Sequence, residues 1–210
     1  EIVWKSSIIE EYVRNKTGIS DKPLMASDVM HIKEVNIQNK EVGDISDLIH
    51  LPNLEHVVFY ECGIKDISVI GELKKVWSLD LARNQIEDIS CLINHESLQY
   101  LSLQDNQITD ATPIGTIKTQ VKKIELQDNP LDCDLSFIFK FNSSMEILRL
   151  SHVQGFDVSK LSDAKKMTNI SLDDMGITDI SFVSKMKKLK SLSMEDNQIT
   201  DISVLKNCSD

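Results

Sequence analysis

An internal repeat of 22 to 24 residues constrains the fold of this chain more than any other feature of its 210-residue sequence. Eight units each open on an apolar residue, at Ile32, Leu54, Val76, Leu98, Val121, Met145, Met167 and Leu189. Within the third unit, apolar residues follow at Leu79, Leu81, Ile86, Ile89 and Leu92, and most other units keep this spacing. One unit cannot bury its own apolar side chains, so the units must stack and share a continuous core.

The spacing L-x-x-L-x-L-x-x-N-x-L is typical of leucine-rich repeats. Positions 4 and 6 of each unit alternate with polar neighbours, which indicates a half-buried strand. The sequence therefore predicts an α/β fold: a leucine-rich repeat solenoid, a curved right-handed superhelix with a parallel β-sheet on the concave face and an N-terminal helical cap. We assign residues 1–31 to the cap and residues 32–210 to eight repeats that form one continuous domain.

Position 9 carries Asn in four units, at Asn84, Asn106, Asn129 and Asn197. We expect these amides to point inward and to bond backbone groups that the turning chain leaves unpaired. Cys62 takes this position in the second unit, a common substitute, whereas Lys40, Val153 and Met175 interrupt the series. Since two interruptions follow the lengthened fourth and fifth units, we expect units four to six to be locally irregular.

Every unit also carries an Asp two residues before a Ser or Thr. The pairs are Asp44 and Ser46, Asp66 and Ser68, Asp88 and Ser90, Asp110 and Thr112, Asp134 and Ser136, Asp157 and Ser159, Asp179 and Ser181, and Asp201 and Ser203. Such side chains accept hydrogen bonds from nearby backbone N–H groups, so the column predicts caps of short turns on the convex side. The alternative is a stripe of cation sites.

The two ends differ from the repeats and from each other. Apolar residues from Ile2 to Val13 recur every three or four positions, which predicts a helix over roughly Ile2–Arg14, with Gly18 as its stop. A second short helix should begin at Ser27 and Asp28 and lead into the first repeat. The sequence predicts no comparable cap after the eighth repeat, so we expect that end to pack on a further domain or on another copy.

Composition and motifs exclude several functional classes. The net charge of −10 argues against nucleic acid as the main partner. The sequence contains no run of 18 apolar residues, so we predict no transmembrane segment in it. The five His form no metalloprotease motif, and no nucleophile elbow or phosphate-binding loop is present. Cys62, Cys91, Cys133 and Cys208 form no C-x-x-C pair, so we expect free thiols. We predict neither enzymatic activity nor a cofactor.

The unit that ends N-x-I-x-D-I-S-x-L, complete at Asn84–Leu92 and Asn197–Leu205, resembles the repeats of internalin-like surface proteins of bacteria. The lead-in Ser27-Asp28-Val29-x-x-Ile32 resembles the N-terminal caps of such proteins. The resemblance implies a secreted or cell-surface bacterial protein that binds a protein, or alternatively a glycan, through its concave face. The alternative function is a cytoplasmic regulatory scaffold that binds an enzyme subunit.

Positions 3, 5, 7 and 8 of the repeats should face solvent on the concave sheet, and they hold 10 acids against 3 bases. Our candidate partner-binding residues there are His56, Val58, Tyr60, Asp80, Arg83, Tyr100, Asp105, Lys123, Glu125 and Arg149. Tyr and small apolar areas are typical of binding hot spots, although ordinary surface variation is the alternative. Asp173, Asp174, Glu195 and Asp196 are candidates for a basic protein partner or for Ca²⁺, or form a plain solvated face.

Overall fold

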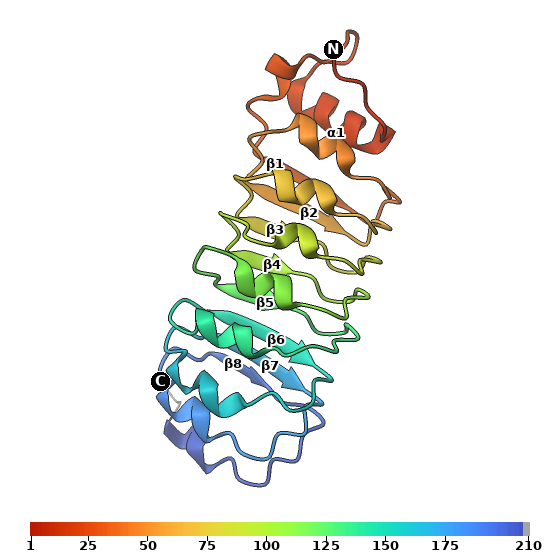
Figure 1. The fold of residues 1–210 in the computed structure, drawn as a ribbon. Coiled ribbons are helices and arrows are strands. Elements are labelled where there is room, and N and C mark those ends of the chain that lie inside the picture. Colours follow the sequence, from red (N-terminus) through yellow and green to blue (C-terminus); the bar gives the residue numbers. More distant parts are fainter. Residues whose placement is uncertain (208–210) are drawn as a thin grey trace.

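The computed structural model describes residues 1–207 as one elongated stack of repeats (Figure 1). Eight strands form a single parallel sheet in the order β1 to β8. Their bounds are β1 Glu34–Gln38, β2 His56–Tyr60, β3 Ser78–Asp80, β4 Tyr100–Ser102, β5 Lys123–Glu125, β6 Ile147–Ser151, β7 Asn169–Asp173 and β8 Ser191–Ser193. One strand per repeat, each beside its predecessor, is the arrangement that the 22-residue period predicts.

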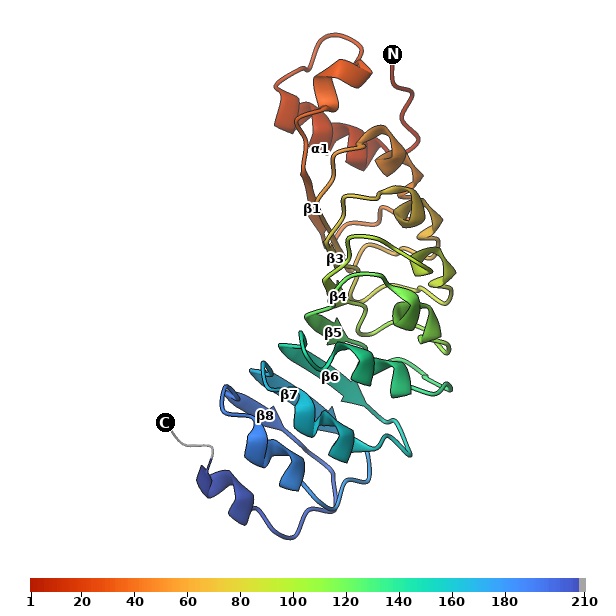
Figure 2. The ribbon, with the colours of Figure 1, turned by 60° about the vertical axis from the view of Figure 1, so that its left-hand side comes forward.

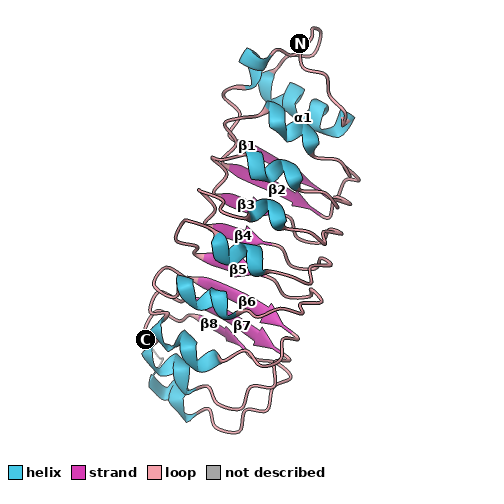
Figure 3. Ribbon diagram, viewed as in Figure 1, coloured by secondary structure: helices cyan, strands magenta, loops and turns pink. Residues whose placement is uncertain are grey.

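The return path of each repeat is a short 3₁₀ helix on the opposite side (Figure 3). Ala26–Val29 forms η1 in the cap, and the repeats contribute η2 Ser46–His50, η3 Ser68–Glu72, η4 Ser90–Leu92, η5 Thr112–Thr116, η6 Ser136–Phe141, η7 Val158–Asp163, η8 Ser181–Lys185 and η9 Ser203–Asn207. Figure 2 shows that the stack bends toward its strands, so the sheet lines the concave side and the helices the convex side. The predicted fold class is confirmed.

The core is a set of aliphatic rows that run along the solenoid. Position 4 gives one such row, because Val35 pairs with Val57, and the same register continues through Leu79, Leu101, Ile124, Leu148, Ile170 and Leu192. The first seven of these side chains are buried. Each therefore packs on equivalents in the repeats before and after it, and the apolar surface of one repeat is removed from water only by its neighbours.

The Asp column caps the convex turns as predicted. In all eight repeats the Asp Oδ1 accepts a hydrogen bond from the backbone N–H two residues later, at 2.7 to 3.2 Å. The backbone and side chain of Ser203 lower the pKa of Asp201, and those of Ser46 lower the pKa of Asp44. Hydrogen bonding to the charged form thus favours ionised Asp44 and Asp201. The same backbone hydrogen bond fixes the entry to each of the eight turns.

The inward Asn ladder is also confirmed. Asn84 donates to the backbone oxygens of Phe59 and Leu81 and accepts from the N–H groups of Cys62 and Ile64. Asn106, Asn129 and Asn197 make the equivalent interstrand contacts. Cys62 lies buried in the same column, as expected. These amides satisfy buried backbone groups that no ladder bond reaches.

The expected irregularity of the middle repeats lies in the loop after β5 and in the turns before β5 and β6, where the chain is one residue longer at each place. Elsewhere the residue after the ladder Asn donates its N–H to the preceding repeat, as Gln85 does to Ile64 and Gln107 to Ile86. The fifth repeat has Pro130 at this point, which has no N–H, and Asp132 instead donates to Thr109. The strand pairing of β4 to β7 continues in register, so the extra residues do not disturb the sheet.

The N-terminal helix α1 spans Ser7–Thr17, so the predicted start at Ile2 is wrong by five residues. Residues 2–6 are tied down differently: the N–H of Ile2 donates to Leu24, and those of Lys5 and Ser6 donate to the buried carboxylate of Asp47. Tertiary hydrogen bonds thus override the helical periodicity of this segment. Ser6 Oγ then caps the helix by accepting from Ile9, and Gly18 ends it at φ 71° as predicted.

The second cap helix, η1, begins one residue before the predicted Ser27. Buried residues of both cap helices join the same core as the repeats. The opposite end is more open: Leu192, Met194 and Ile199 are only half-buried, and Ile202 is 64% exposed. Cys208 lies outside the described residues.

Truncating the position-4 row should destabilise the whole stack. Leu101 is fully buried, so Leu101→Ala removes apolar contacts and leaves a cavity, which should lower the free energy of unfolding by about 2–5 kcal/mol. Urea titration followed by circular dichroism measures this change. Gln107→Ala, at an exposed position of the same repeat, should change the midpoint little. Equal effects of the two substitutions would contradict the assigned core.

Acid should weaken the junction of repeats three and four through His95. This side chain is 1% exposed, its Nδ1 accepts from the N–H of Ser97, and burial followed by Lys74 lowers its pKa. Because the unfolded chain binds the proton more readily, stability is full above about pH 6.5 and falls as the pH drops below that value.

Replacing His95 tests this origin of the acid sensitivity. His95→Leu should reduce the loss of unfolding free energy between pH 7.5 and pH 5, measured by urea titration at both pH values. His31→Leu, at an exposed histidine of the cap, serves as the control and should leave that loss unchanged. An unchanged loss in His95→Leu would show that other groups cause it.

Candidate functional site

The concave face of repeats two to four carries an aromatic patch, which we define as His56, Val58, Tyr60, Trp77 and Tyr100. The His56 ring meets Trp77 edge-on, with centroids 4.1 Å apart, and Trp77 meets Tyr100 in the same manner at 5.6 Å. Each of the five side chains is half-buried. The parallel register sets their spacing, since it pairs His56 with Ser78 and Ser78 with Tyr100. The patch is therefore a rigid, partly exposed aromatic surface across three repeats.

Trp77 is the functional candidate that the sequence analysis missed. It lies at position 2, just before β3 begins, and so outside the positions that we expected to face the concave side. Its signal was present in the sequence, because the other seven repeats carry Lys33, Glu55, Gln99, Lys122, Glu146, Thr168 and Lys190 there. An aromatic residue in an otherwise polar column marks a departure from what the repeat itself requires.

Charged side chains surround the aromatic patch and are mostly paired. The Arg83 guanidinium lies 5.5 Å from the centre of the Tyr60 ring, 3.3 Å from Asp105 and 4.0 Å from Glu61. The Lys122 ammonium lies 5.7 Å from the centre of the Tyr100 ring. These cations hold the two tyrosine rings in place by cation–π attraction.

Two carboxylates border the same patch. Asp80 pairs in register with Val58 and Ser102, and its Oδ1 accepts from the N–H of Ala82. Glu55 forms an ion pair with Lys33 at 2.7 Å. The hydrogen bond from Lys33 is the main cause that lowers the pKa of Glu55, and Trp77 adds to it. Both acids are half-buried beside the aromatic rings.

Glu125 is buried, with 5% of its surface exposed, although we expected it to face solvent. Its carboxylate lies 2.8 Å from Lys123 Nζ and 3.4 Å from Arg149, and it accepts from Ser102 Oγ at 2.8 Å. Neighbouring side chains cover it because the concave curvature brings adjacent strands' side chains together. These four residues form an ionic cluster with a net charge of +1, which adjoins the aromatic patch because Lys123 pairs in register with Tyr100.

Much of the acidity of the concave rim has a backbone cause. The residue at position 8 adopts a left-handed conformation in all eight repeats, with φ between 51° and 59°: Asn39, Glu61, Arg83, Asp105, Asp128, His152, Asp174 and Asp196. Asn and Asp tolerate this conformation best, and they fill five of the eight positions. The acids at these positions are thus explained by the turn, which the sequence analysis did not recognise.

In the acidic group of repeats seven and eight, Asp173 and Asp174 already contact other residues of the protein. Burial raises the pKa of Asp173, but hydrogen bonds from Ser171, Ser193 and the N–H of Glu195 outweigh it and lower the pKa overall. His152 Nε2 lies 3.5 Å from Asp174. Within residues 1–207, no three His, Cys, Asp or Glu side chains are arranged to hold a metal ion. These acids lie well away from the aromatic patch along the chain.

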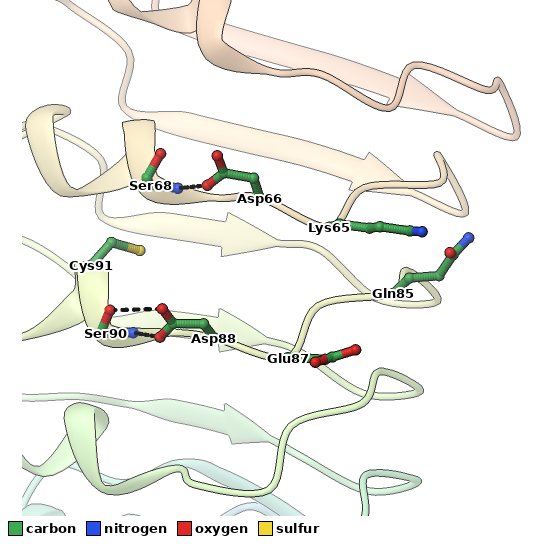
Figure 4. Close-up of a pocket in the computed structure, with 8 residues that line it drawn as sticks. All are labelled: Lys65, Asp66, Ser68, Gln85, Glu87, Asp88, Ser90 and Cys91. Carbon is green, nitrogen blue, oxygen red and sulfur yellow. Dashed lines mark hydrogen bonds between the residues drawn. The ribbon is translucent and has the colours of Figure 1, made fainter.

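A groove of about 400 Å³ lies between the convex turns of repeats two and three (Figure 4). Asp66 and Asp88 line it, and each is bonded to the Ser of its own cap, Ser68 or Ser90. Burial, followed by the charges of Asp88 and Asp66, raises the pKa of the Cys91 thiol to about 12. That thiol stays protonated at neutral pH, so the groove offers no activated nucleophile.

Family comparisons identify the repeats independently. A family model described as "Leucine Rich repeats (2 copies)" matches residues 165–207, and one described as "Leucine Rich repeat" matches residues 94–111. No curated protein matches the sequence significantly. Within residues 1–207, no helix is both long and apolar enough to cross a bilayer.

Solved structures extend the similarity to the whole chain. An internalin C2 of Listeria monocytogenes has a TM-score of 0.87 at 26% identity, over 99% of this chain and 91% of that one. A second Listeria monocytogenes internalin, InlF, has a TM-score of 0.68 at 18% identity, over 98% of this chain and 74% of that one. The plant peptide hormone receptor RGFR1 in complex with RGF2 shares the fold, with a TM-score of 0.56 at 16% identity over 80% and 32%. The chain therefore has the leucine-rich repeat fold and is similar over its whole length to internalin C2.

Proposed function

We propose that this protein is a non-enzymatic binding module that recognises a protein partner through its concave face, with the aromatic patch as the energetic centre. The observation that carries the proposal is the row of His56, Trp77 and Tyr100, which stack edge-on across three repeats and stay half-exposed. Trp and Tyr are enriched among the residues that dominate binding energy at protein interfaces.

The aromatic patch is suited to binding because its side chains are already held in place before a partner binds. Edge-to-face packing and the two cation–π contacts already hold the rings, and the strands beneath them are rigid. A partner would therefore lose less free energy to side-chain ordering than at a flexible loop surface. Asp80 at the border, which has no ion-pair partner among the described residues, favours a partner with basic groups near an apolar anchor.

The remaining candidate residues would form the border of the interface. Arg83 and Asp105 neutralise each other at one side. Lys123, Glu125 and Arg149 form the polar boundary in repeats five and six, where buried Glu125 acts on a partner only through the two cations that it holds. Such polar borders contribute specificity more than affinity.

The comparisons support the class of partner and the location. One similar solenoid is described as a plant peptide hormone receptor in complex with RGF2, and two others are bacterial internalins. We infer that this chain acts at the cell surface of a bacterium or is secreted. The cytoplasmic scaffold is the second candidate, since Cys62, Cys91 and Cys133 are free thiols. Protease added to intact source cells would digest a surface protein and spare a cytoplasmic one.

Truncating the aromatic patch should weaken binding without unfolding the protein. The double variant Tyr60→Ala with Tyr100→Ala should lower the affinity for a partner bound at the concave face by about thirtyfold or more, as is typical of hot-spot residues. The single variant Trp77→Ala should have an effect of the same size. Partners would be found by screening purified extracellular proteins and glycans, and affinities measured by calorimetry. Phe156→Ala, which removes a half-buried aromatic side chain outside the sheet, is the control.

The outcome of these variants separates site from core. Unchanged affinity in both aromatic variants, the tyrosine double variant and Trp77→Ala, would place the partner elsewhere. A collapse of the thermal unfolding transition in the tyrosine pair would show that those rings belong to the core instead.

The C-terminal end supports a separate proposal, that it packs on a further domain or on another copy. Half-buried Leu192 and Met194 and exposed Ile202 leave apolar surface there. If copies pack through this end, Ile202→Glu should abolish a concentration-dependent dimer in sedimentation velocity, and Thr200→Glu, at an exposed polar position nearby, should not. A chain that remains monomeric at high concentration would contradict self-packing.

A further inference from the structure

Charges of opposite sign are separated onto the two edges of the sheet. The loops that follow the strands, from position 8 to the capped Ser or Thr, hold sixteen acidic and three basic residues over the eight repeats. The turns that precede β2 to β8, taken as the six residues before each strand, hold ten lysines and five acidic residues. These turns form the left-hand edge in Figure 3, and the loops beyond the arrowheads form the right-hand edge. Although the chain has a net charge of −10, the edge of the sheet formed by these turns is positively charged.

Lysines at the start of that positive edge are engaged with the protein itself. Lys74 Nζ donates to the backbone oxygen of Gly71, and Lys75 Nζ donates to Asn53 at 2.6 Å. Lys118 pairs with Glu96 at 3.1 Å, and Lys122 lies against the Tyr100 ring. Structural contacts thus account for these four lysines.

The lysines of the last two turns are different. We define the lysine patch as Lys165, Lys166, Lys185, Lys187, Lys188 and Lys190, all of which are exposed. Among the described residues, none of their six ammonium groups lies within ion-pair distance of a carboxylate or has a recorded hydrogen bond. Asp163 is the one acid in the segments 163–168 and 185–190.

The repeat brings these charges together. Lys187 and Lys188 follow Lys165 and Lys166 by 22 residues, one repeat, and the two turns make the same backbone contacts before β7 and β8. Equivalent residues of adjacent parallel strands lie about 5 Å apart. Like charges at that spacing repel each other, and an anionic surface would relieve the repulsion.

We propose that the lysine patch docks this protein on an anionic lipid surface. Clusters of four to eight basic residues bind such surfaces because each Lys near the headgroups adds to the attraction. The acidic loops lie on the opposite edge, and at physiological salt their repulsion is screened beyond about 8 Å. Docked by this edge at its C-terminal end, the solenoid leaves the aromatic patch of repeats two to four free for its partner.

The composition of the patch favours lipid over the other polyanions. Sequence-tolerant nucleic-acid sites combine cations with aromatic side chains on which bases stack, and the two segments contain none. The patch also lacks Arg, the residue best suited to paired contacts with carboxylates on an acidic protein. Mobile lysines instead suit a fluid array of phosphate headgroups.

Vesicle co-sedimentation tests the proposal with a matched pair of variants. The full chain would be mixed with vesicles containing 30% phosphatidylglycerol in phosphatidylcholine, and with pure phosphatidylcholine vesicles. We expect binding only to the anionic vesicles, with loss of binding at high salt. Lys187→Glu with Lys188→Glu should lower the partition coefficient about thirtyfold or more. Lys74→Glu with Lys75→Glu, at the same two repeat positions and with the same charge change, should lower it far less.

Several results would overturn the proposal. These are no binding to anionic vesicles, or an equal loss in both double variants, which would indicate net charge alone. Retention of a soluble polyphosphate but not of vesicles would make the partner a free polyanion. A salt-sensitive dimer that Lys187→Glu with Lys188→Glu dissociates, without vesicle binding, would instead assign the patch to the acidic edge of a second copy. Circular dichroism of both variants verifies that each is folded.

Discussion

Each repeat of this protein is completed by its neighbours, and the rest of the structure depends on that mutual completion. The position-4 row removes one repeat's aliphatic side chains from water only by packing them on the next repeat. The inward Asn residues do the same for polar groups, since Asn84 bonds backbone atoms of two adjacent repeats at once. Stacking each repeat on the one before it thus buries the apolar side chains and satisfies the buried backbone groups together. Because every repeat is stacked in the same way, the strands form a parallel sheet with constant register.

That constant register explains why an extended face can act as a binding site. Side chains separated by 22 residues become neighbours, so His56, Trp77 and Tyr100 meet although they belong to three repeats. The same geometry limits which charges are available to a partner. Glu125 forms ion pairs with Lys123 and Arg149. Asp173 accepts hydrogen bonds from Ser171, Ser193 and the Glu195 backbone. Both carboxylates therefore stabilise the sheet and are less available to a ligand.

Positional demands of the repeat also produce the separation of charge. The loops after the strands require an Asp cap and favour Asn or Asp in the left-handed position, so acids accumulate at that edge for structural reasons. The turns before the strands have no such requirement. Their lysines are therefore the residues whose presence the fold does not explain, most clearly in the two turns before β7 and β8. A residue type that the repeat does not need is the best indication of a function.

The sequence by itself determined the number of strands, their order, the Asn ladder and the Asp caps, because each recurs at a constant spacing and follows from local chemistry. Tertiary structure decided the rest. The start of α1 moved to Ser7 because distant Asp47 binds the N–H groups of Lys5 and Ser6. Trp77 joined the aromatic patch, and Glu125 left the solvent-exposed face, because curvature and neighbouring side chains determine exposure. A repeat pattern specifies which positions point inward, but the burial of an outward side chain depends on its neighbours in space, which no single unit contains.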